Sequence, residues 1–560
     1  MFSALFSGKN AKLILALLAI LVIFSGLGLR APWPADEPRF AQVAIEMVDS
    51  GQWFFPMRGG ELYPDKPPVF MWSIAFFYWL LGSIKLAFLL PSALCGLLTL
   101  YLVYDLGKRL WNEQTGILAA ALLLMSFQFV LQAKTAQIDA MVCAWITLGC
   151  YGLLRHIYCK DGWHWYYLGF AAMGLGVITK GVGFLPLLML LPFFLARHFR
   201  PAADDIQGGW RWWAGPLAML AVIALWFVPM LILVANSNDA AFELYRDNIL
   251  LKQTAKRYAD SWHHIKPFWY YLTSVIPLFW LPLSLLLPWL LPKWWRAIKA
   301  GDRRIILPLG WVILVLVFFS LSPGKRGVYI LPALPMLTLI SAPFLHDVLQ
   351  RRWPARLING VVALLGSLLL IMAIAGLLGV EKIQSLVDDY PIQPWWFLLS
   401  LGVIGLLGGL FVRDQGKSWL VFILPFWLLY STWGYALLGP VKTPQQVLSN
   451  LQHHEPNPVP LVIIGLKEQF LLFAPYPLGH FGYHTPIRLQ AQAAWQWLAE
   501  HPDGKVLVAR QSGLNCLNFD KGIDLGFAHR EDWLLLDNSA RQPDCLVENP
   551  ALPVFYAAKP

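Results

Sequence analysis

Long apolar segments separated by short basic connections dominate the first 440 residues of the chain. About 20 consecutive apolar residues are needed for a helix to cross the hydrocarbon core of a bilayer. The pattern therefore predicts a polytopic α-helical membrane protein with about 13 transmembrane helices. The predicted spans lie at residues 13–29, 86–104, 115–131, 139–157, 165–180, 181–196, 213–235, 268–292, 305–321, 329–346, 357–379, 395–412 and 418–438.

The pattern changes after residue 440. Short apolar runs at Leu461–Ile464, Lys505–Ala509 and Trp533–Leu536 have the length of buried strands, and Gln490–Glu500 has the spacing of a helix. We therefore predict two domains, a transmembrane domain at residues 1–440 and a small α/β domain at residues 441–560.

Composition supports the membrane interpretation. Of the 560 residues, 58% are hydrophobic and 14% are charged, whereas soluble domains carry about 25% charged residues. This excludes a soluble enzyme, a disordered protein and a disulfide scaffold. A net charge of +10 in a soluble protein would suggest nucleic acid binding, but membrane proteins concentrate Lys and Arg in their cytoplasmic loops. We therefore expect no nucleic acid partner.

The basic residues also predict the orientation of the chain. Starting from a cytoplasmic N-terminus, one set of alternate connections contains more Lys and Arg than the other, as expected for the cytoplasmic side. The opposite face then carries two long loops, 30–85 and 236–267, and the turn Ser322–Val328. An odd number of spans places residues 441–560 on that outer face, outside the cytoplasm. Cys516 and Cys545 could form a disulfide there.

The first outer loop contains charged residues at two points. Asp36, Glu37 and Arg39 directly follow the first span, where the acids could be catalytic or could simply begin a helix. Asp65 and Lys66 precede two prolines, so they should lie on an extended corner before an interfacial helix at 69–81. Lys66 suits a lipid phosphate, although it could also merely extend towards the headgroups.

Three more charged residues, Asp139, Lys180 and Lys325, lie at the outer ends of predicted helices. Their shared position favours one convergent anion-binding surface over three isolated charges. The second long outer loop, 236–267, contains both basic and aromatic residues. Basic residues such as Arg257 could bind a phosphate, and the aromatic rings could bind a sugar.

A divalent metal site is the alternative for part of this surface. His263 and His264 could bind a metal ion together with Asp36, Glu37 or Asp65, but adjacent His side chains usually point apart. No cofactor is required by the sequence.

These motifs in this order resemble the bacterial aminoarabinose transferases that modify lipid A, within the GT-C glycosyltransferases that include protein O-mannosyltransferases. The resemblance covers residues 13–440 and rests on a series of short motifs, namely Asp36-Glu37-x-Arg39, Asp65-Lys66-Pro67, Asp139, Thr179-Lys180-Gly181, Pro267-Phe268-Trp269-Tyr270-Tyr271 and Gly324-Lys325-x-x-x-Tyr329-Ile330-Leu331-Pro332. It implies a GT-C fold of thirteen helices with a periplasmic C-terminal domain.

The resemblance also implies an activity. It predicts an inverting transferase of the bacterial inner membrane that moves aminoarabinose or a related sugar from undecaprenyl phosphate to lipid A. Asp36 would be the catalytic carboxylate, with Glu37 and Asp139 beside it. The residues implied to bind the donor phosphate or sugar are Arg39, Asp65, Lys66, Lys180, Lys325 and Tyr329, and the positive charge of Arg257 makes it a further candidate for the leaving phosphate.

Two alternatives stay open at this point. The same fold could transfer a sugar to a hydroxyl group of a protein or glycan. A transporter or flippase is the third hypothesis, although transporters usually place charges near the middle of the membrane and contain repeats, and neither feature is visible in this sequence.

Overall fold

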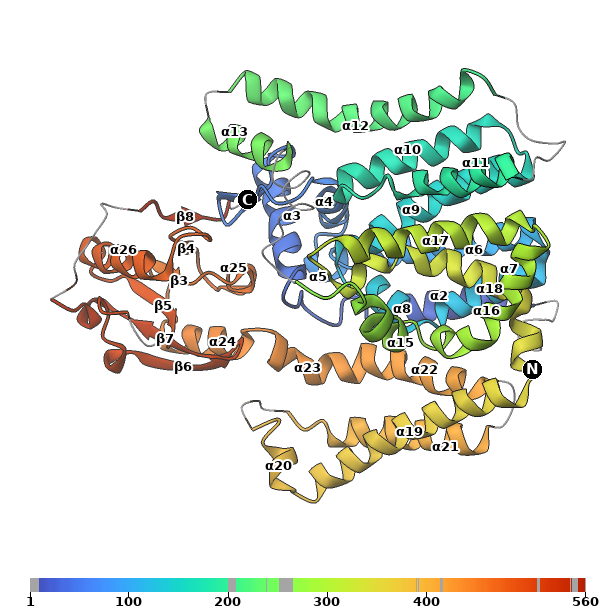
Figure 1. Ribbon diagram of the computed structural model, residues 1–560. Helices are drawn as coiled ribbons and strands as arrows, with labels where there is room; N and C mark the ends of the chain where they lie inside the picture. The colour runs from blue at the N-terminus through green and yellow to red at the C-terminus, as the bar shows by residue number, and fades with distance from the viewer. Residues whose placement is uncertain are drawn as a thin grey trace.

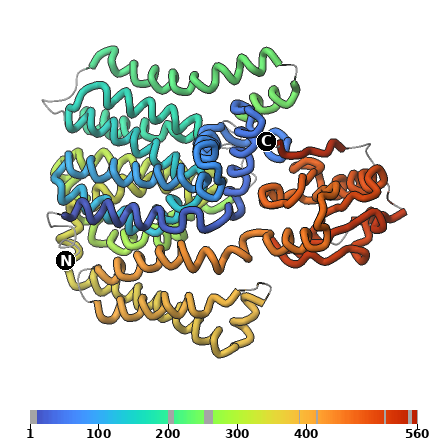
Figure 2. The backbone as a smooth tube through the Cα atoms, turned by 180° about the vertical axis from the view of Figure 1, so that it is seen from behind, coloured from blue at the N-terminus to red at the C-terminus, as the bar shows by residue number. Residues whose placement is uncertain are grey.

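The computed structural model describes residues 10–199, 208–237, 239–250, 265–388, 390, 392–412, 416–510, 514–543, 545 and 552–558. A bundle of long helices occupies one side of the molecule, and a sheet-rich C-terminal region lies against one end of it (Figure 1). The start of the first described helix lies at the opposite end of the bundle in both views (Figure 2).

The bundle contains an inner and an outer set of helices. Its inner helices, such as α7 (Glu113–Leu124) and α9 (Ile138–Leu154), are buried over most of their length. Its outer helices, such as α12 (Arg211–Ala235) and α19 (Arg352–Leu377), are also apolar but expose large side chains along most of their length. Apolar helices with exposed apolar faces are typical of membrane spans. The other helices of the bundle are α2 (Ala11–Phe24), α5 (Ile84–Ala87), α6 (Leu90–Leu110), α8 (Phe127–Ala133), η1 (Arg155–Cys159), α10 (Trp163–Lys180), η2 (Leu185–Met189), α11 (Leu190–Phe199), α13 (Ala240–Asp247), η4 (Tyr271–Val275), α15 (Ile276–Phe279), α16 (Leu283–Lys299), α17 (Arg303–Leu321), η5 (Gly327–Ile330), α18 (Ala333–Leu349), α20 (Glu381–Gln384), α21 (Trp395–Phe411), α22 (Lys417–Leu429), η6 (Tyr430–Gly434) and α23 (Tyr435–Lys442).

Six helices among the described residues are long and apolar enough to cross a membrane, and two bent helix pairs raise that number to eight. The bent pairs fall on the spans predicted at 115–131 and 268–292, and each of these segments contains a sharp bend. The first pair bends by 73° between α7 and α8, and the second by 111° before α16. Pro282 contributes to the second bend because proline has no amide hydrogen for the helical hydrogen bond. The count of thirteen spans stays a prediction.

The first outer loop folds into two helices and a hairpin. These are α3 (Glu37–Ser50), β1 (Met57–Arg58), β2 (Glu61–Leu62) and α4 (Val69–Leu81). The strands join through Gly59 and Gly60, whose positive φ angles of 67° and 81° suit a two-residue hairpin turn. Glu46 accepts hydrogen bonds from both glycine amides and so ties the hairpin to α3. The helix predicted at 69–81 is confirmed as α4.

The C-terminal region contains a six-stranded sheet with strand order β6-β7-β5-β3-β4-β8. Strand β3 is parallel to both β4 and β5, and the outer pairs are antiparallel. Its elements are α24 (Gln445–His454), β3 (Leu461–Ile464), α25 (Glu468–Phe473), β4 (Leu478–His480), α26 (Ile487–Glu500), β5 (Lys505–Ala509), η7 (Phe519–Lys521), β6 (Ile523–Ala528), β7 (Glu531–Leu536), η8 (Asn538–Ala540) and β8 (Phe555–Tyr556).

Helices cover both faces of this sheet. Val462 and Ile464 pack with residues of α26, whereas Leu461 and Ile463 pack with residues of α24 and α25. Because successive residues of a strand point to opposite faces, a fully apolar strand requires this double cover. All three predicted strands and the predicted helix are confirmed.

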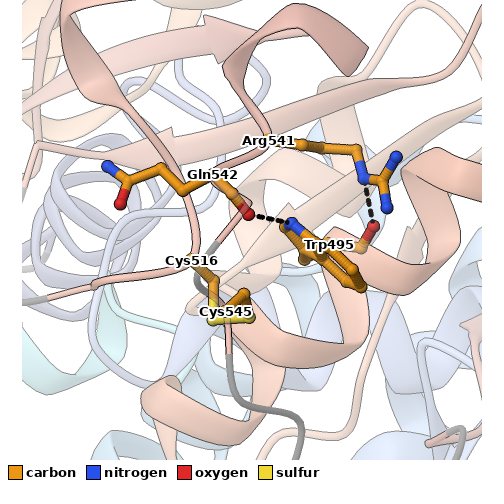
Figure 3. The surroundings of a disulfide bond; sticks show 5 residues. All are labelled: Trp495, Cys516, Arg541, Gln542 and Cys545. Carbon is orange, nitrogen blue, oxygen red and sulfur yellow. Dashed lines mark hydrogen bonds between the residues drawn. A yellow bond between two sulfur atoms is a disulfide. The ribbon is translucent and has the colours of Figure 1, made fainter.

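Cys516 and Cys545 form a disulfide in this region (Figure 3). The backbone beside it is held by Trp495, whose indole N–H donates to the carbonyl of Gln542 at 2.8 Å. The Arg541 guanidinium donates in turn to the carbonyl of Trp495 at 2.9 Å. The disulfide therefore joins a segment that is already anchored to α26.

Candidate active site

A buried ion pair fixes the start of α3. The Glu37 carboxylate binds the guanidinium of Arg30 through both oxygens, and it also accepts hydrogen bonds from the amides of Trp33 at 2.7 Å and Ala136 at 2.9 Å. Arg30 donates further to the carbonyl of Lys134 at 3.1 Å. These bonds clamp the segment before α9 against the segment that carries Asp36.

Asp36 lies directly before α3, yet its side chain makes no hydrogen bond that caps this helix. Its Oδ2 accepts instead from Gln137 Nε2 at 3.2 Å and from Arg326 Nη2 at 3.1 Å. Burial lowers the pKa of Arg326, but Asp36 and Asp139 outweigh burial and hold this pKa above its ordinary value. Asp36 is therefore oriented by partners from two distant segments.

Asp139 and Lys180 form the second half of the cluster. Asp139 lies in the first turn of α9 and Lys180 in the last turn of α10, and the two side chains form an ion pair that is nearly buried. The Lys180 amine also lies 4.7 Å from the centre of the Tyr329 ring. The structure thus brings together Asp36, Asp139, Lys180 and Tyr329, as the sequence predicts.

Lys325 lies against backbone carbonyls, and its role at the donor phosphate stays a prediction. Its amine is buried and donates to the carbonyls of Ser322 at 2.5 Å and Lys266 at 2.9 Å, and burial lowers its pKa. It thereby holds the turn after α17 against the segment at residues 265–266. The neighbouring Arg326 takes the position facing Asp36.

Arg39 contacts the C-terminal region, and its role in donor binding stays a prediction. Its Nε donates to Glu468 of α25 at 2.8 Å, and its Nη2 donates to the Tyr483 hydroxyl at 3.3 Å. Burial lowers the pKa of Arg39, but the carboxylate of Glu468 outweighs burial and raises this pKa above its ordinary value. The residue expected at the donor phosphate therefore binds the C-terminal region.

Asp65 and Lys66 lie between β2 and α4, on a corner without regular secondary structure, as predicted. The Lys66 amine donates to the carbonyl of Asp65 at 2.9 Å. The hydroxyl of Tyr245, from α13, donates to the carbonyl of Lys66 at 3.4 Å. The corner is therefore held by the start of the second outer loop.

The remaining predicted residues, Arg257, His263 and His264, lie outside the described residues. Within the part of the chain that the structure describes, no group of three or more His, Cys, Asp and Glu side chains is arranged to hold a metal ion.

The sequence interpretation missed Arg326 and Gln137. Each lies within a stretch whose neighbouring residue, Lys325 or Asp139, had been selected instead. The sequence does show that Arg326 is a second basic residue next to Lys325. Which of the two faces Asp36 depends on the backbone conformation of the turn that carries them.

The cluster combines two carboxylates with two cations at the ends of four separate segments. Such a site can neutralise negative charge that develops on a leaving phosphate, while a carboxylate orients an acceptor or balances positive charge on a sugar.

Comparisons with known proteins give consistent results. A family model described as dolichyl-phosphate-mannose-protein mannosyltransferase matches residues 65–233. An undecaprenyl phosphate-alpha-4-amino-4-deoxy-L-arabinose arabinosyl transferase 2 from Sodalis glossinidius is 32% identical over 461 residues, covering 79% of this chain and 78% of the relative. The corresponding transferase 1 from Pseudomonas fluorescens is 33% identical, covering 66% of this chain and 67% of that protein.

A solved structure shares the fold. The crystal structure of ArnT from Cupriavidus metallidurans bound to undecaprenyl phosphate matches 96% of this chain and all of that chain, with a TM-score of 0.73 and 22% sequence identity.

Proposed function

Because the chain belongs to the family of undecaprenyl phosphate-alpha-4-amino-4-deoxy-L-arabinose arabinosyl transferases, we propose that it transfers this aminoarabinose from undecaprenyl phosphate to lipid A. The reaction takes place at the periplasmic face of the inner membrane. The observation that carries the proposal is the Asp36 carboxylate, held by Arg326 and lying in one cluster with the Asp139–Lys180 ion pair.

The chemistry follows from the charges of the two substrates. The bond between the anomeric carbon and the carrier phosphate oxygen breaks, and its electron pair leaves with undecaprenyl phosphate. A phosphate oxygen of lipid A forms the new bond to the same carbon. This acceptor is already ionised, so Asp36 does not need to remove a proton, and it instead orients the acceptor or balances positive charge on the sugar.

Several residues in and near the cluster receive roles in this scheme. Lys66 binds the carrier phosphate, and Lys180 and Arg326 stabilise the charge that develops on it. Asp139 fixes Lys180, and the Tyr329 ring lies beside that amine. Glu37 serves as a structural brace, since its hydrogen bonds go to Arg30 and to the backbone amides of Trp33 and Ala136.

The domain arrangement forms part of the proposal. Residues 1–440 form a transmembrane domain of about thirteen helices with a cytoplasmic N-terminus, and residues 441–560 form a periplasmic domain. The Cys516–Cys545 disulfide supports this placement, because disulfides persist in the oxidising periplasm rather than the cytoplasm. The position of the start of α2 and of the C-terminal region at opposite ends agrees with it (Figure 2).

A second candidate is transfer to a hydroxyl group of a protein or glycan. The mannosyltransferase family match over residues 65–233 favours it. In that reaction Asp36 would act as a general base, because a neutral hydroxyl must lose its proton during attack. A transporter or flippase would not depend on Asp36 for group transfer.

Mass spectrometry of lipid A distinguishes these functions. A strain lacking the gene receives wild type, Asp36→Asn, Lys66→Ala, or the matched control Asp347→Asn, whose carboxylate pairs with Lys293 and is 60% exposed. Wild type and control should add the mass of an aminoarabinose, and the two site variants should not.

If lipid A stays unmodified while wild-type protein and donor are both present, lipid A is not the acceptor. The search then moves to envelope proteins and glycans. If Asp36→Asn still modifies lipid A at the wild-type level, Asp36 is not catalytic.

A further inference from the structure

The C-terminal region binds the first outer loop through one carboxylate. Glu468, the first residue of α25, is buried and lies 2.8 Å from Arg39 Nε and 3.4 Å from Arg58 Nη1. Arg39 lies on α3, three residues after Asp36, whereas Arg58 belongs to strand β1. One side chain from the end of the sequence therefore joins the helix and the hairpin of the loop that carries the candidate catalytic carboxylate.

Further contacts surround this carboxylate. The Tyr483 ring centre lies 3.5 Å from the Arg58 guanidinium carbon, and the Tyr483 amide donates to Glu61 at 2.7 Å. His480 bonds the carbonyl of Gly59 at 2.9 Å. A Cβ atom on Gly60 would meet the carbonyl oxygen of Tyr556 at 2.1 Å, so strand β8 lies directly against the hairpin.

The same region also holds the segment before Asp36. Gln469 Nε2 donates to the carbonyl of Pro32 at 2.6 Å and to the carbonyl of Lys442 at 2.8 Å. Adjacent residues of α25 thus fix the chain four residues before Asp36 and three residues after it. Asp36 itself lies between these two anchors.

Among these contacts between the C-terminal region and the first outer loop, Glu468 matters most because it carries the negative charge that two arginines bind. Two guanidinium groups from the outer loop share its carboxylate, and Arg58 is almost fully buried. Removal of the carboxylate would leave both guanidinium groups without the carboxylate that they bind, which is unfavourable for a buried charge. Arg39 would then be expected to move towards water, and α3 would move with it.

We propose that Glu468 is a positioning residue for Asp36 and acts through Arg39, so that the C-terminal region forms part of the machinery for sugar transfer. This inference rests on the proposed function. A displacement of about 1 Å at a reacting group can lower a rate by as much as 100-fold, so loss of this anchor should reduce turnover without abolishing donor binding.

The test uses purified full-length protein in lipid nanodiscs with undecaprenyl phosphate-linked aminoarabinose and lipid A. The variants are Glu468→Gln, Glu468→Asp and the control Glu455→Gln. Glu455 forms an ion pair with Lys505 at 2.9 Å inside the C-terminal region, and its side chain is 20% exposed, compared with 10% for Glu468. Glu468→Gln should lower kcat by about tenfold and change the donor KM by less than about twofold, and Glu455→Gln should change neither.

The Glu468→Asp variant distinguishes two explanations for a loss of activity, namely loss of the negative charge and loss of side-chain packing. Glutamine has nearly the shape of glutamate but no charge, whereas aspartate keeps the charge and is shorter. The proposal requires Glu468→Asp to retain more activity than Glu468→Gln, because the ion pair with Arg39 survives. The opposite ranking would overturn it, as would wild-type turnover in Glu468→Gln.

A double-variant cycle provides the second measurement. If Glu468 acts through Arg39, the pair Arg39→Gln and Glu468→Gln should lose no more turnover than the worse single variant, and additive losses would overturn the inference. If Glu468→Gln does not fold, Tyr483→Phe decides the matter, since it removes only the hydroxyl that accepts from Arg39. About a threefold fall in kcat supports the proposal, and unchanged kcat overturns it.

The failure of the proposed function is distinguishable from these results. If the wild-type protein transfers no aminoarabinose to lipid A under the same conditions, the proposed function is refuted. If the wild type is active and the variants are unaffected, only the inference about Glu468 is refuted.

Discussion

Replacement of Arg326 by glutamine tests whether the Asp36 carboxylate depends on its guanidinium partner. Arg326 Nη2 lies 3.1 Å from Asp36 Oδ2, and the two carboxylates of the site hold the pKa of Arg326 above its ordinary value against the effect of burial. We expect Arg326→Gln to leave the protein folded and to reduce sugar transfer. The reason is that Asp36 would lose its charged partner and retain Gln137.

The size of the effect follows from the exposure of the pair. A hydrogen bond between charged groups contributes about 1.5–3 kcal/mol. The Arg326 side chain is 37% exposed and Asp36 is 20% exposed, so water screens the interaction and the lower end applies. About 1.4 kcal/mol corresponds to about a tenfold loss in kcat/KM. Arg326→Lys keeps the charge without the planar fork and should fall between wild type and Arg326→Gln.

The assay measures initial rates of transfer to lipid A with purified protein in nanodiscs. Arg304→Gln is the matched control, because Arg304 is 40% exposed and pairs with Asp302 at 2.9 Å on a turn that we place at the cytoplasmic face. The reasoning is refuted if Arg326→Gln retains the wild-type kcat/KM, or if Arg304→Gln loses as much activity as Arg326→Gln.

Three further predictions concern stability. Arg30→Met leaves the buried Glu37 carboxylate without its ion-pair partner and should lower the free energy of unfolding by about 3–5 kcal/mol. A melting temperature in detergent equal to that of wild type would contradict this. Cys516→Ser removes the disulfide and should cost about 3 kcal/mol, so reductant should lower the wild-type melting temperature but leave that of the variant unchanged. Burial lowers the pKa of His480, whose neutral ring bonds the carbonyl of Gly59 and accepts from the amide of Gly482. Since the unfolded ring takes up a proton near pH 6.5 and the folded ring does so only at lower pH, stability should be complete above about pH 6.5 and decline below it. Melting curves from pH 7.5 to 5.0 should show this decline in wild type and less of it in His480→Asn, and equal slopes would refute it.

Most of the secondary structure could be predicted from local patterns. Helix α4 coincides with the aromatic segment at 69–81, because a proline pair before it and Gly82 after it mark both ends. Strands β3 and β5 were visible as short apolar runs, since strands covered on both faces are apolar throughout. The bends at 73° and 111° were not visible, because the hydropathy of the sequence continues through both of them.

Within the candidate site, the pairing of Asp139 with Lys180 was partly predictable. Asp139 lies in the first turn of α9 and Lys180 in the last turn of the following helix α10, so the two charges are expected at the same end of a helix pair. Near the hydrocarbon, each of these charges requires a partner of opposite sign. The assignment of Arg39 was not predictable in this way. Its partner Glu468 lies 429 residues further along the chain, and nothing in the local sequence of either residue indicates the other.

The sequence by itself determined that this chain is a largely helical membrane protein with charged outer loops and a sheet-rich C-terminal region. Hydrophobicity and its periodicity act over 5 to 20 residues, so they can be interpreted locally. Only the tertiary structure decided that Arg326 rather than Lys325 faces Asp36, and that Arg39 turns towards Glu468. Those choices depend on the backbone direction of a turn and on the docking of two distant segments, because the free energy of a buried charge is set by the groups that surround it in space.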